Sequence, residues 1–325
     1  MTVRIYFNVA DLARTHIAER PDPLWEAVLS MHVLQRHEGA PAFTRWRRRT
    51  LPRLDGSARA LLTLAPPRGY RPDFLTPTGS ALGLEQGLRS LAATSPDRFR
   101  ADLGLFARLH RIPLWVRDLR PRNLPRIADA MREYYSVAVR PYESQLRSHV
   151  QADSSLRTLA LQSSGIDVLL NSLCPQVRWQ YPLLEVHSES PDRDIRLDGR
   201  GLRLIPSFFC SHGPMMLRDP QLPPVLVYPV KPRPGWEYST HGSGRAHGGV
   251  KSPCAALVGN TRAAALEAIA DGCTTSELAR RLEVSPAAAS HHTAILREAG
   301  LISSQRSGGS VQHTLKPLGK ALLCC

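Results

Sequence analysis

The stretch TTSELARRLEVSPAAASHHTAILREAG, residues 274–300, decides the fold of the C-terminal part of this chain. Thr274 and Glu277 form a capping box, in which each side chain binds the other residue's backbone N–H, so a helix is predicted to begin there. Ser285 before a proline is a second strong start signal. Gly300 ends the second helix, because glycine adopts the left-handed C-terminal conformation with least strain. The pattern therefore predicts two short helices joined by a tight turn.

The second predicted helix leaves a stripe of small and polar side chains facing outward. Its apolar positions face inward, and the outward positions are Ala287, Ser290, His291, Ala294 and Arg297. Small side chains at its N-terminal end would let the helix approach base edges in a DNA groove. Adjacent helical residues point about 100 degrees apart, so only one histidine of the neighbouring pair can face DNA. We assign His291 outward and His292 to the flank, as a satisfied structural histidine.

Two short strands are predicted after this helix, at residues 301–305 and 310–315. They enclose Arg306-Ser307-Gly308-Gly309, which is typical of a hairpin turn and would give the hairpin a basic tip. Helix, turn, helix and hairpin together predict a winged helix-turn-helix that docks on duplex DNA. The DNA-contacting residues that we expect are Ser285, Ala287, Ser290, His291, Arg297, Gln305, Arg306 and Ser307.

These residues resemble bacterial ArsR/SmtB-type regulators. The resemblance is carried by Leu278-Ala279, Ser285, Ser290-His291-His292, Leu296, Ala299-Gly300-Leu301 and the predicted hairpin. Two further segments, residues 206–210 and 222–229, resemble a longer subgroup whose large N-terminal domain has no assigned chemistry. The resemblance implies a sequence-specific DNA-binding transcription regulator, usually a repressor released by its ligand, that acts as a homodimer.

The sequence departs from the resembling family at two places. Some family members carry a Cys-x-Cys metal site in the first helix of the motif, where this chain has Thr274, Thr275 and Ser276. The large apolar residue that usually follows the histidine is Thr293 here. Sensing of arsenic or zinc by that route is therefore not expected.

Composition sets bounds on the remaining sequence. A chain of 325 residues fits two or three domains, each able to bury its own core. The net charge of +14 suits a nucleic-acid partner, but nearly all the basic residues are arginines, a bias that a G+C-rich genome would produce. From residue 241 onward there are nine basic and five acidic residues, so most of the excess lies in residues 1–240. A basic surface there could flank DNA, although a solvated surface is the simpler interpretation.

The chain shows no sign of a membrane or secretory address. No apolar run approaches the length of a membrane span, and the first residues are too polar for a signal peptide. We therefore expect a cytoplasmic protein with no membrane partner. Its cysteines follow no repeated spacing and are expected to be reduced thiols, at positions 174, 210, 254, 273, 324 and 325.

The pattern of apolar residues divides the chain into segments. Helical spacing dominates residues 1–175, with Pro141 expected to kink or divide a long helical pattern and a further helix expected to begin at Gly165. Strand-like alternation takes over in residues 176–240. Residues 241–251 lack large apolar side chains and predict a flexible linker. The expected fold is α+β and mainly helical: a helical domain with a small antiparallel sheet over residues 1–240, then a winged helix-turn-helix over residues 252–325.

Residues 1–240 offer few candidates for catalysis or metal binding. No nucleophile elbow, phosphate-binding loop or zinc-binding helix motif occurs there, so we predict neither an enzyme nor a cofactor. Cys210 and His212 could bind a soft metal, but a packed cysteine beside an exposed histidine is the simpler interpretation. Phe43 and Trp46 alternate with arginines like a nucleic-acid patch, but an amphipathic helix with both rings inward is the favoured interpretation. An enzyme or metal or redox sensor fused to a DNA reader, a non-specific DNA-binding protein and a winged domain for protein contacts remain alternatives.

The size of the N-terminal domain predicts a signal-receiving role. A chain that only binds DNA has no use for a domain with its own cores, so we expect a small-molecule effector to bind there. A cleft between a helical layer and a sheet layer is a common place for such a pocket. The effector is predicted to be organic and largely apolar, and its candidate contacts are Trp25, Trp115, Tyr134, Tyr135, Trp179 and Phe208.

Overall fold

The chain divides into two compact units in a computed structural model. Unit 1 comprises residues 1–242 and unit 2 residues 243–325. The structure describes residues 1–36, 41–188, 192–232, 236, 258–269, 272–282, 284–307 and 310–323. The linker predicted at residues 241–251 lies outside these ranges.

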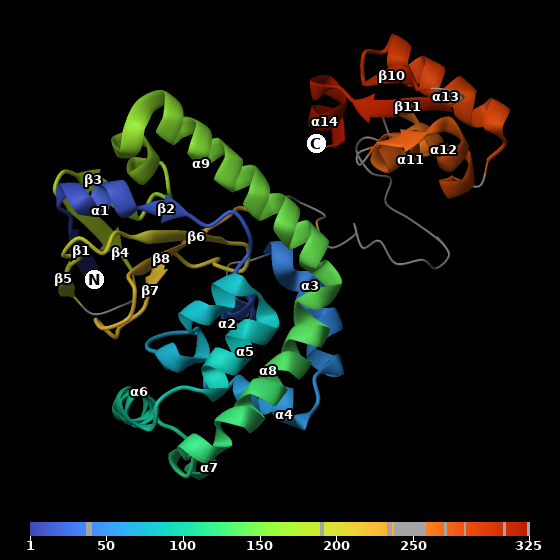
Figure 1. The fold of residues 1–325 in the computed structure, drawn as a ribbon. Coiled ribbons are helices and arrows are strands. Elements are labelled where there is room, and N and C mark those ends of the chain that lie inside the picture. The colour runs from blue at the N-terminus through green and yellow to red at the C-terminus, as the bar shows by residue number, and fades with distance from the viewer. Residues whose placement is uncertain are drawn as a thin grey trace. The chain divides into compact units, whose positions relative to one another are not determined.

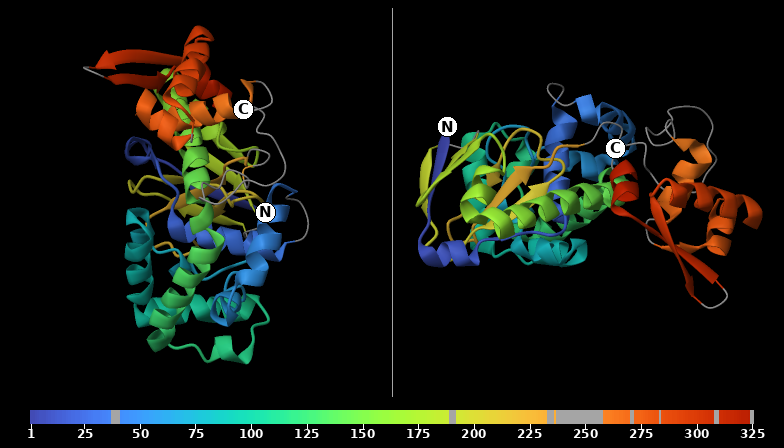
Figure 2. Two further views of the ribbon diagram at one scale, coloured as in Figure 1. Left: turned by 90° about the vertical axis from the view of Figure 1, so that its right-hand side faces the viewer. Right: turned by 90° about the horizontal axis from the view of Figure 1, so that it is seen from above.

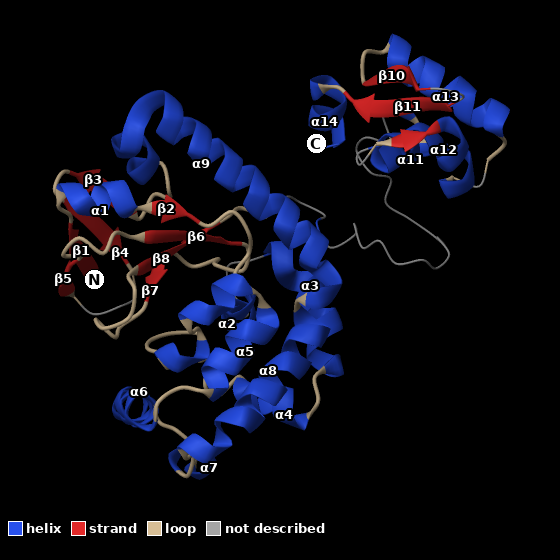
Figure 3. Ribbon diagram, viewed as in Figure 1, coloured by secondary structure: helices blue, strands red, loops and turns tan. Residues whose placement is uncertain are grey.

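Unit 1 combines helices with two sheets (Figures 1 and 3). Its helices are α1 (Val9–Arg14), α2 (Pro23–Gln35), α3 (Thr44–Thr50), α4 (Gly56–Leu61), α5 (Leu84–Ala92), α6 (Pro96–Leu109), α7 (Leu114–Arg117), α8 (Leu124–Ala138) and α9 (Glu143–Asn171). Its strands are β1 (Thr2–Tyr6), β2 (His16–Ile17), β3 (Val177–Gln180), β4 (Leu183–His187), β5 (Arg193–Arg196), β6 (Arg203–Ser207), β7 (Met215–Met216) and β8 (Val225–Pro229). The prediction of a mainly helical unit with small sheets is confirmed.

The two sheets differ from the single antiparallel sheet that the sequence predicts. One has the strand order β3-β4-β1-β5 and the other β2-β6-β8-β7. The pairs β1–β5, β2–β6 and β6–β8 are parallel, and the other pairs are antiparallel. Residues 3–9 alternate weakly like a strand, in agreement with β1, but the sequence does not predict β2. The antiparallel prediction is wrong because β1 and β2 join strands that follow far along the chain, and because β6 and β8 pair in parallel.

Strands β6 and β8 form a middle layer that is covered on both faces. Leu204 and Leu226 point into a core shared with the β3-β4-β1-β5 sheet, whereas Ile205 and Val227 point into the core of the helices. Parallel strands buried on both faces are typically continuous apolar runs. Unit 1 therefore has three layers, with α9 running beside the helices and the sheets (Figure 2).

A buried carboxylate joins α2 to the end of β6. Glu26 is 1% exposed, and its carboxylate accepts hydrogen bonds from the Ser207 hydroxyl at 3.0 Å and from the backbone N–H groups of Phe208 at 2.8 Å and Phe209 at 3.0 Å. Burial raises the pKa of Glu26 to about 7, although the three hydrogen bonds oppose that shift. This contact fixes the chain where it leaves the sheet and enters the helical core.

The long helical pattern breaks at Pro141, as predicted. Helix α8 ends at Ala138, and α9 begins at Glu143 after a short 3-10 turn. The sequence predicts separate helices after that point, but α9 continues through residues 150–153. Its backbone leaves the helical region at Gly165, where φ is +80°. A glycine is needed there because other residues rarely adopt this conformation.

Unit 2 is a small helical unit with a three-stranded sheet (Figure 1). Its helices are α11 (Asn260–Ile269), α12 (Thr275–Arg281), α13 (Pro286–Glu298) and α14 (Pro317–Leu323). Its strands are β9 (Cys273–Thr274), β10 (Ile302–Ser307) and β11 (Ser310–Leu315), in the order β10-β11-β9. The two predicted helices of the motif, the helix expected at residues 261–269 and the hairpin are present, whereas α14 and β9 are additional elements. A further helix expected at residues 255–258 lies almost entirely outside the described residues.

Candidate nucleic-acid interface

Side-chain caps fix the beginnings of α12 and α13. The backbone N–H of Glu277 donates to the Thr274 hydroxyl at 3.2 Å, and the N–H of Thr274 donates to the Glu277 carboxylate at 3.0 Å. The N–H of Ala288 donates to the Ser285 hydroxyl at 3.2 Å. Gly300 follows α13 with a φ of +70°. The predicted start and stop signals are thus confirmed, and they set the turn between the two helices.

The two helices pack on α11 through a core of aliphatic side chains. Leu278 of α12, Leu296 of α13 and Leu266 of α11 are at most 1% exposed and belong to one cluster. No tryptophan, tyrosine or phenylalanine occurs in residues 243–325. Unit 2 is therefore held by interlocking aliphatic residues, which keep the outer face of α13 at a fixed orientation.

The outer face of α13 carries the residues that the sequence assigned to it. The described structure leaves Ser285, Ala287, Ser290, His291 and Arg297 exposed to solvent, whereas Ala294, also predicted to face outward, is half-buried. The N-terminal half of this face has only small or polar side chains, and Arg297 stands one to two turns further on. A backbone with so little side-chain bulk can approach a flat or grooved partner closely, and the guanidinium can donate to an acceptor on that partner.

The hairpin provides a second exposed edge. Strands β10 and β11 pair antiparallel from Ile302↔Leu315 to Ser307↔Ser310. Gln305 and Arg306 are exposed near its end. The turn at residues 308–309 and the side chain of Ser307 lie outside the described part of the chain. The hairpin thus adds a basic side chain to the exposed surface of unit 2.

A buried histidine links the hairpin to α12. His313 of β11 is 3% exposed, and its ring forms hydrogen bonds with the Thr275 hydroxyl at 2.9 Å and the Ser304 hydroxyl at 2.8 Å. Burial lowers the pKa of His313, and the charge of Arg297 lowers it further. The sequence analysis missed this residue, although strand alternation places it on the same face as Val311 and Leu315.

Replacing His313 with alanine is expected to lower the free energy of unfolding of unit 2 by about 2–4 kcal/mol, because two hydrogen bonds and a buried ring are lost. Far-UV circular dichroism during urea unfolding measures this change. The matched control is His291→Ala, since His291 is an exposed histidine of the same unit. An equal loss in both variants would contradict the structural role of His313.

The same histidine predicts how the stability of unit 2 responds to pH. The pKa of His313 is lower in the folded unit than its ordinary value of 6.5, so the unfolded chain binds the proton more readily. The stability that depends on neutral His313 is present above pH 6.5 and declines as the pH falls below it. The His313→Ala variant should show a smaller decline over the same range.

Two neighbouring side chains on α13, His292 and Thr293, have surroundings that the sequence did not predict. His292 lies on the flank near α11, where burial and then the charge of Arg262 lower its pKa. Its Nδ1 has no hydrogen-bond partner among the residues that the structure describes, so it is not the satisfied histidine that was predicted. Thr293 is buried and donates its hydroxyl proton to the Ser290 carbonyl at 3.0 Å. This local bond lets a threonine occupy a core position.

The aromatic residues predicted as effector contacts do not gather in one pocket. Trp25, Tyr134, Tyr135 and Phe208 belong to the closed core of the helices, and Trp179 belongs to the core between the sheets. Trp115 is 43% exposed on α7. Phe43 and Trp46 are also buried among the helices, which supports the amphipathic-helix interpretation of that segment. The aromatic residues in these cores therefore offer no common apolar site.

The two candidate metal ligands, Cys210 and His212, make different local contacts. The Cys210 thiol is buried and donates to the Gly213 carbonyl at 3.1 Å, and burial raises its pKa. The His212 ring instead forms a hydrogen bond with the neighbouring Ser211 hydroxyl at 2.6 Å. Within the described ranges, no group of three histidine, cysteine or acidic side chains is placed to hold a metal ion.

Part of unit 2 matches a known protein family. Residues 260–304 match the family described as bacterial regulatory protein, arsR family. The matched segment comprises α11, α12, α13 and the first residues of β10. No curated protein and no solved structure matches the chain. Among the helices described, none is long and apolar enough to cross a membrane.

Proposed function

Residues 260–304 carry the helix-turn-helix of the ArsR family, and from this premise we propose that the protein is a sequence-specific DNA-binding transcription regulator. The observation that carries the proposal is the family match on a segment in which helix α13 exposes a small, polar face. Unit 1 is then the receiving part of the molecule, and unit 2 is the part that reads DNA.

In this proposal α13 lies in the major groove. The exposed residues Ala287, Ser290 and His291 approach the base edges, and Arg297 donates hydrogen bonds to a base or a phosphate. The hairpin acts as a wing, whose Arg306 contacts the phosphate backbone or the adjacent minor groove. His313 supports this docking indirectly, because its hydrogen bonds to Thr275 and Ser304 hold the hairpin against the helix-turn-helix.

We further propose that the protein binds as a homodimer to a pseudo-palindromic operator. One recognition helix spans too few base pairs for useful specificity, and two-fold proteins commonly read half-sites one helical turn apart. The proposed default is repression that a ligand of unit 1 relieves. Unit 1 would bind that ligand without converting it, so turnover of a bound metabolite would contradict this part of the proposal.

The test is a binding titration with the DNA upstream of the protein's own coding sequence. We expect saturable binding to that fragment and weaker, strongly salt-dependent binding to random DNA of equal length. A footprint should protect two half-sites with two chains bound. Equal affinity for both DNAs would favour a non-specific binder, and no DNA binding at all would indicate a domain used for protein contacts.

A further inference from the structure

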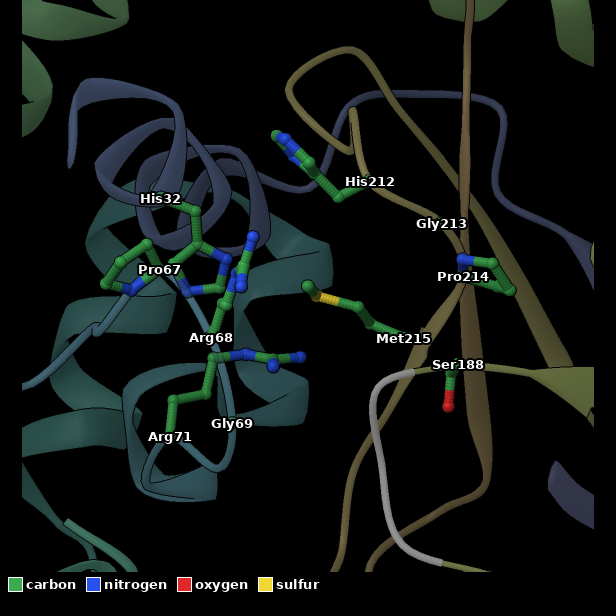
Figure 4. Close-up of a pocket in the computed structure, with 10 residues that line it drawn as sticks. All are labelled: His32, Pro67, Arg68, Gly69, Arg71, Ser188, His212, Gly213, Pro214 and Met215. Atoms are coloured by element: carbon green, nitrogen blue, oxygen red, sulfur yellow. The ribbon is translucent and has the colours of Figure 1, made fainter. Parts of the chain in front are cut away.

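A polar pocket in unit 1 lies where α2, the segment of residues 67–71 and the segment of residues 212–215 meet (Figure 4). Its volume is about 380 Å³ including the open mouth. Arg68 and Arg71 extend into it from one side, and Met215 extends toward them from the other (Figure 4). The pocket thus brings basic side chains to a partly enclosed place that the DNA-binding function does not use.

His32 is the first unusual feature of this pocket. It lies on the buried helix α2, is only 4% exposed and lines the pocket. Neither ring nitrogen has a hydrogen-bond partner among the described residues. Buried polar atoms in native proteins nearly always have a partner, so an exception marks a position where a water molecule, an ion or a ligand can provide one. The imidazole is therefore available to a molecule that enters the pocket.

Arg71 is the second unusual feature of this pocket. Its guanidinium carbon lies 5.3 Å from the centre of the Trp25 ring, which holds the side chain in place. The described residues accept no hydrogen bond from this guanidinium, whereas the half-buried Arg193 donates to the carbonyls of Leu217 at 2.7 Å and Arg218 at 3.2 Å. A guanidinium has five N–H donors, so Arg71 keeps its hydrogen-bonding capacity for a ligand.

The electrostatic surroundings favour an anion. Burial lowers the pKa of His32 well below its ordinary value, and the charge of Arg71 adds to that effect, followed by those of Arg36 and His212. Burial lowers the pKa of Arg71, and the negative charge of Asp73 opposes that shift. However, this carboxylate already accepts the N–H groups of Arg218 and Asp219, each at 2.7 Å. One oxygen of Asp73 is therefore already engaged by two backbone N–H groups, whereas Arg71 and Arg36 both place positive charge near His32.

We propose that this pocket binds an oxyanion, the carboxylate or phosphate group of a small molecule, through the guanidinium of Arg71 and the imidazole of His32. The guanidinium donates two parallel hydrogen bonds to the oxyanion, as planar arginine groups commonly do. His32 in its neutral form donates one further N–H. The site replaces the largely apolar effector that the sequence predicts, because the aromatic residues expected to bind that effector lie in closed cores or on the surface.

A larger cavity beside the pocket offers room for the rest of an organic anion. Its volume is about 810 Å³ including its mouth, and Gly69 and Arg71 line both cavities. Tyr70, Leu109 and Met216 also line it. An anionic group at Arg71 would therefore leave the body of the molecule against a mixed polar and apolar wall. That this molecule is the regulatory signal rests on the proposed DNA-binding function.

The site can be tested in the full-length protein with inorganic phosphate and acetate as probes. Calorimetric titration should show saturable binding of at least one probe, in buffers held at equal ionic strength with chloride. Tryptophan fluorescence during heating should show a higher melting temperature of unit 1 with that probe than with chloride alone. Binding of phosphate but not acetate would identify a tetrahedral anion, and the reverse would identify a carboxylate.

Variants separate the pocket from general charge effects. Arg71→Gln should weaken binding at least tenfold, and Arg71→Lys should retain an intermediate affinity. The matched control is Arg196→Gln, because the guanidinium of Arg196 lies 5.2 Å from the centre of the Tyr6 ring but is exposed. His32→Phe preserves an aromatic ring of similar size, so it should fold and bind the probe several-fold more weakly.

Two results would overturn the proposed site: no saturable binding of either probe to the wild-type protein, or equal binding by wild type and Arg71→Gln. Neither result depends on DNA, so a failure here leaves the DNA-binding proposal intact. Conversely, a protein that binds phosphate but not its promoter would keep the pocket and lose the regulatory role. An anion that binds in the pocket without changing promoter affinity would reject only its role as the signal.

Discussion

Glu26→Ala is expected to lower the free energy of unfolding of unit 1 by about 3–5 kcal/mol, because it leaves three buried donors without an acceptor. These donors are the hydroxyl of Ser207 and the backbone N–H groups of Phe208 and Phe209, which now meet the Glu26 carboxylate. Their loss would loosen the junction between β6 and the helical core. Unit 1 should therefore unfold at a lower denaturant concentration.

Tryptophan fluorescence measures this change selectively. All five tryptophans lie in residues 1–242, so urea unfolding followed by fluorescence reports on unit 1 alone. The matched control is Glu85→Ala, since Glu85 is an exposed carboxylate paired with Arg132 at 3.0 Å. Surface pairs contribute at most about 1 kcal/mol. A Glu26→Ala variant no less stable than Glu85→Ala would show that the buried contact does not hold the junction.

The pH dependence of the same contact has a defined sign. The pKa of Glu26 rises from an ordinary value of 4.5 to about 7 in the folded unit. The folded unit then binds the proton more readily, so this contribution to stability is present below pH 4.5 and is lost as the pH rises through 7. The Glu26→Gln variant cannot titrate at this position. Its stability relative to wild type should improve between pH 5 and pH 8 by about 2–4 kcal/mol.

The double variant Arg297→Ala, Arg306→Ala is expected to bind the promoter fragment about 100-fold or more weakly, because each guanidinium contact with DNA contributes about 1–3 kcal/mol. The two single variants should differ. Loss of Arg306 should weaken binding to specific and random DNA alike and reduce the salt slope by about one, as expected for a phosphate contact. Loss of Arg297 should act more strongly on the specific fragment.

Fluorescence anisotropy of labelled DNA at several salt concentrations measures both effects. The charge-matched control is the double variant Arg178→Ala, Arg196→Ala, which removes two exposed arginines from unit 1. Circular dichroism should show that unit 2 remains folded. Should the Arg297 and Arg306 double variant bind as tightly as wild type, α13 and the hairpin would not be the DNA-contacting surface.

The helix-turn-helix could be predicted from sequence because its signals are local. The reciprocal cap of Thr274 and Glu277 and the cap at Ser285 each lie within four consecutive residues, and the structure contains both. The hairpin is equally local, since β10 and β11 are separated by only two residues. Elements whose local preferences agree with the global fold are the easiest to predict from a sequence.

The sheets of unit 1 could not be predicted in the same way. Strand β1 pairs with β4 and β5, and the two-residue β2 pairs with β6, so the partners lie far apart in the chain. Strand propensity does not specify such partners, and a strand of two residues has no readable period. Strand β8 lies within residues 176–240, where the sequence predicts strands. Its parallel pairing with β6 depends on the connection between them.

The basic pocket escaped the sequence analysis for a related reason. His32 lies among buried apolar residues of α2, where a histidine gives no sign of its missing partner. Arg71 follows a proline-rich segment that reads only as a loop. Their proximity arises from tertiary packing against the segment of residues 212–215. The size of the N-terminal domain predicts a ligand. The chemical class of that ligand could be proposed only once the fold showed which side chains have no hydrogen-bond partner among the described residues.

The position of β1 within its sheet has a consequence for the order of folding. Val3 and Ile5 are buried between partners near residues 184–195, so the first strand must wait during synthesis until those residues have left the ribosome. Contacts of such long sequence separation slow folding. Unit 2 contains mostly short-range pairings and can fold as soon as its own residues emerge. Strand β1 is thus made long before the strands with which it pairs.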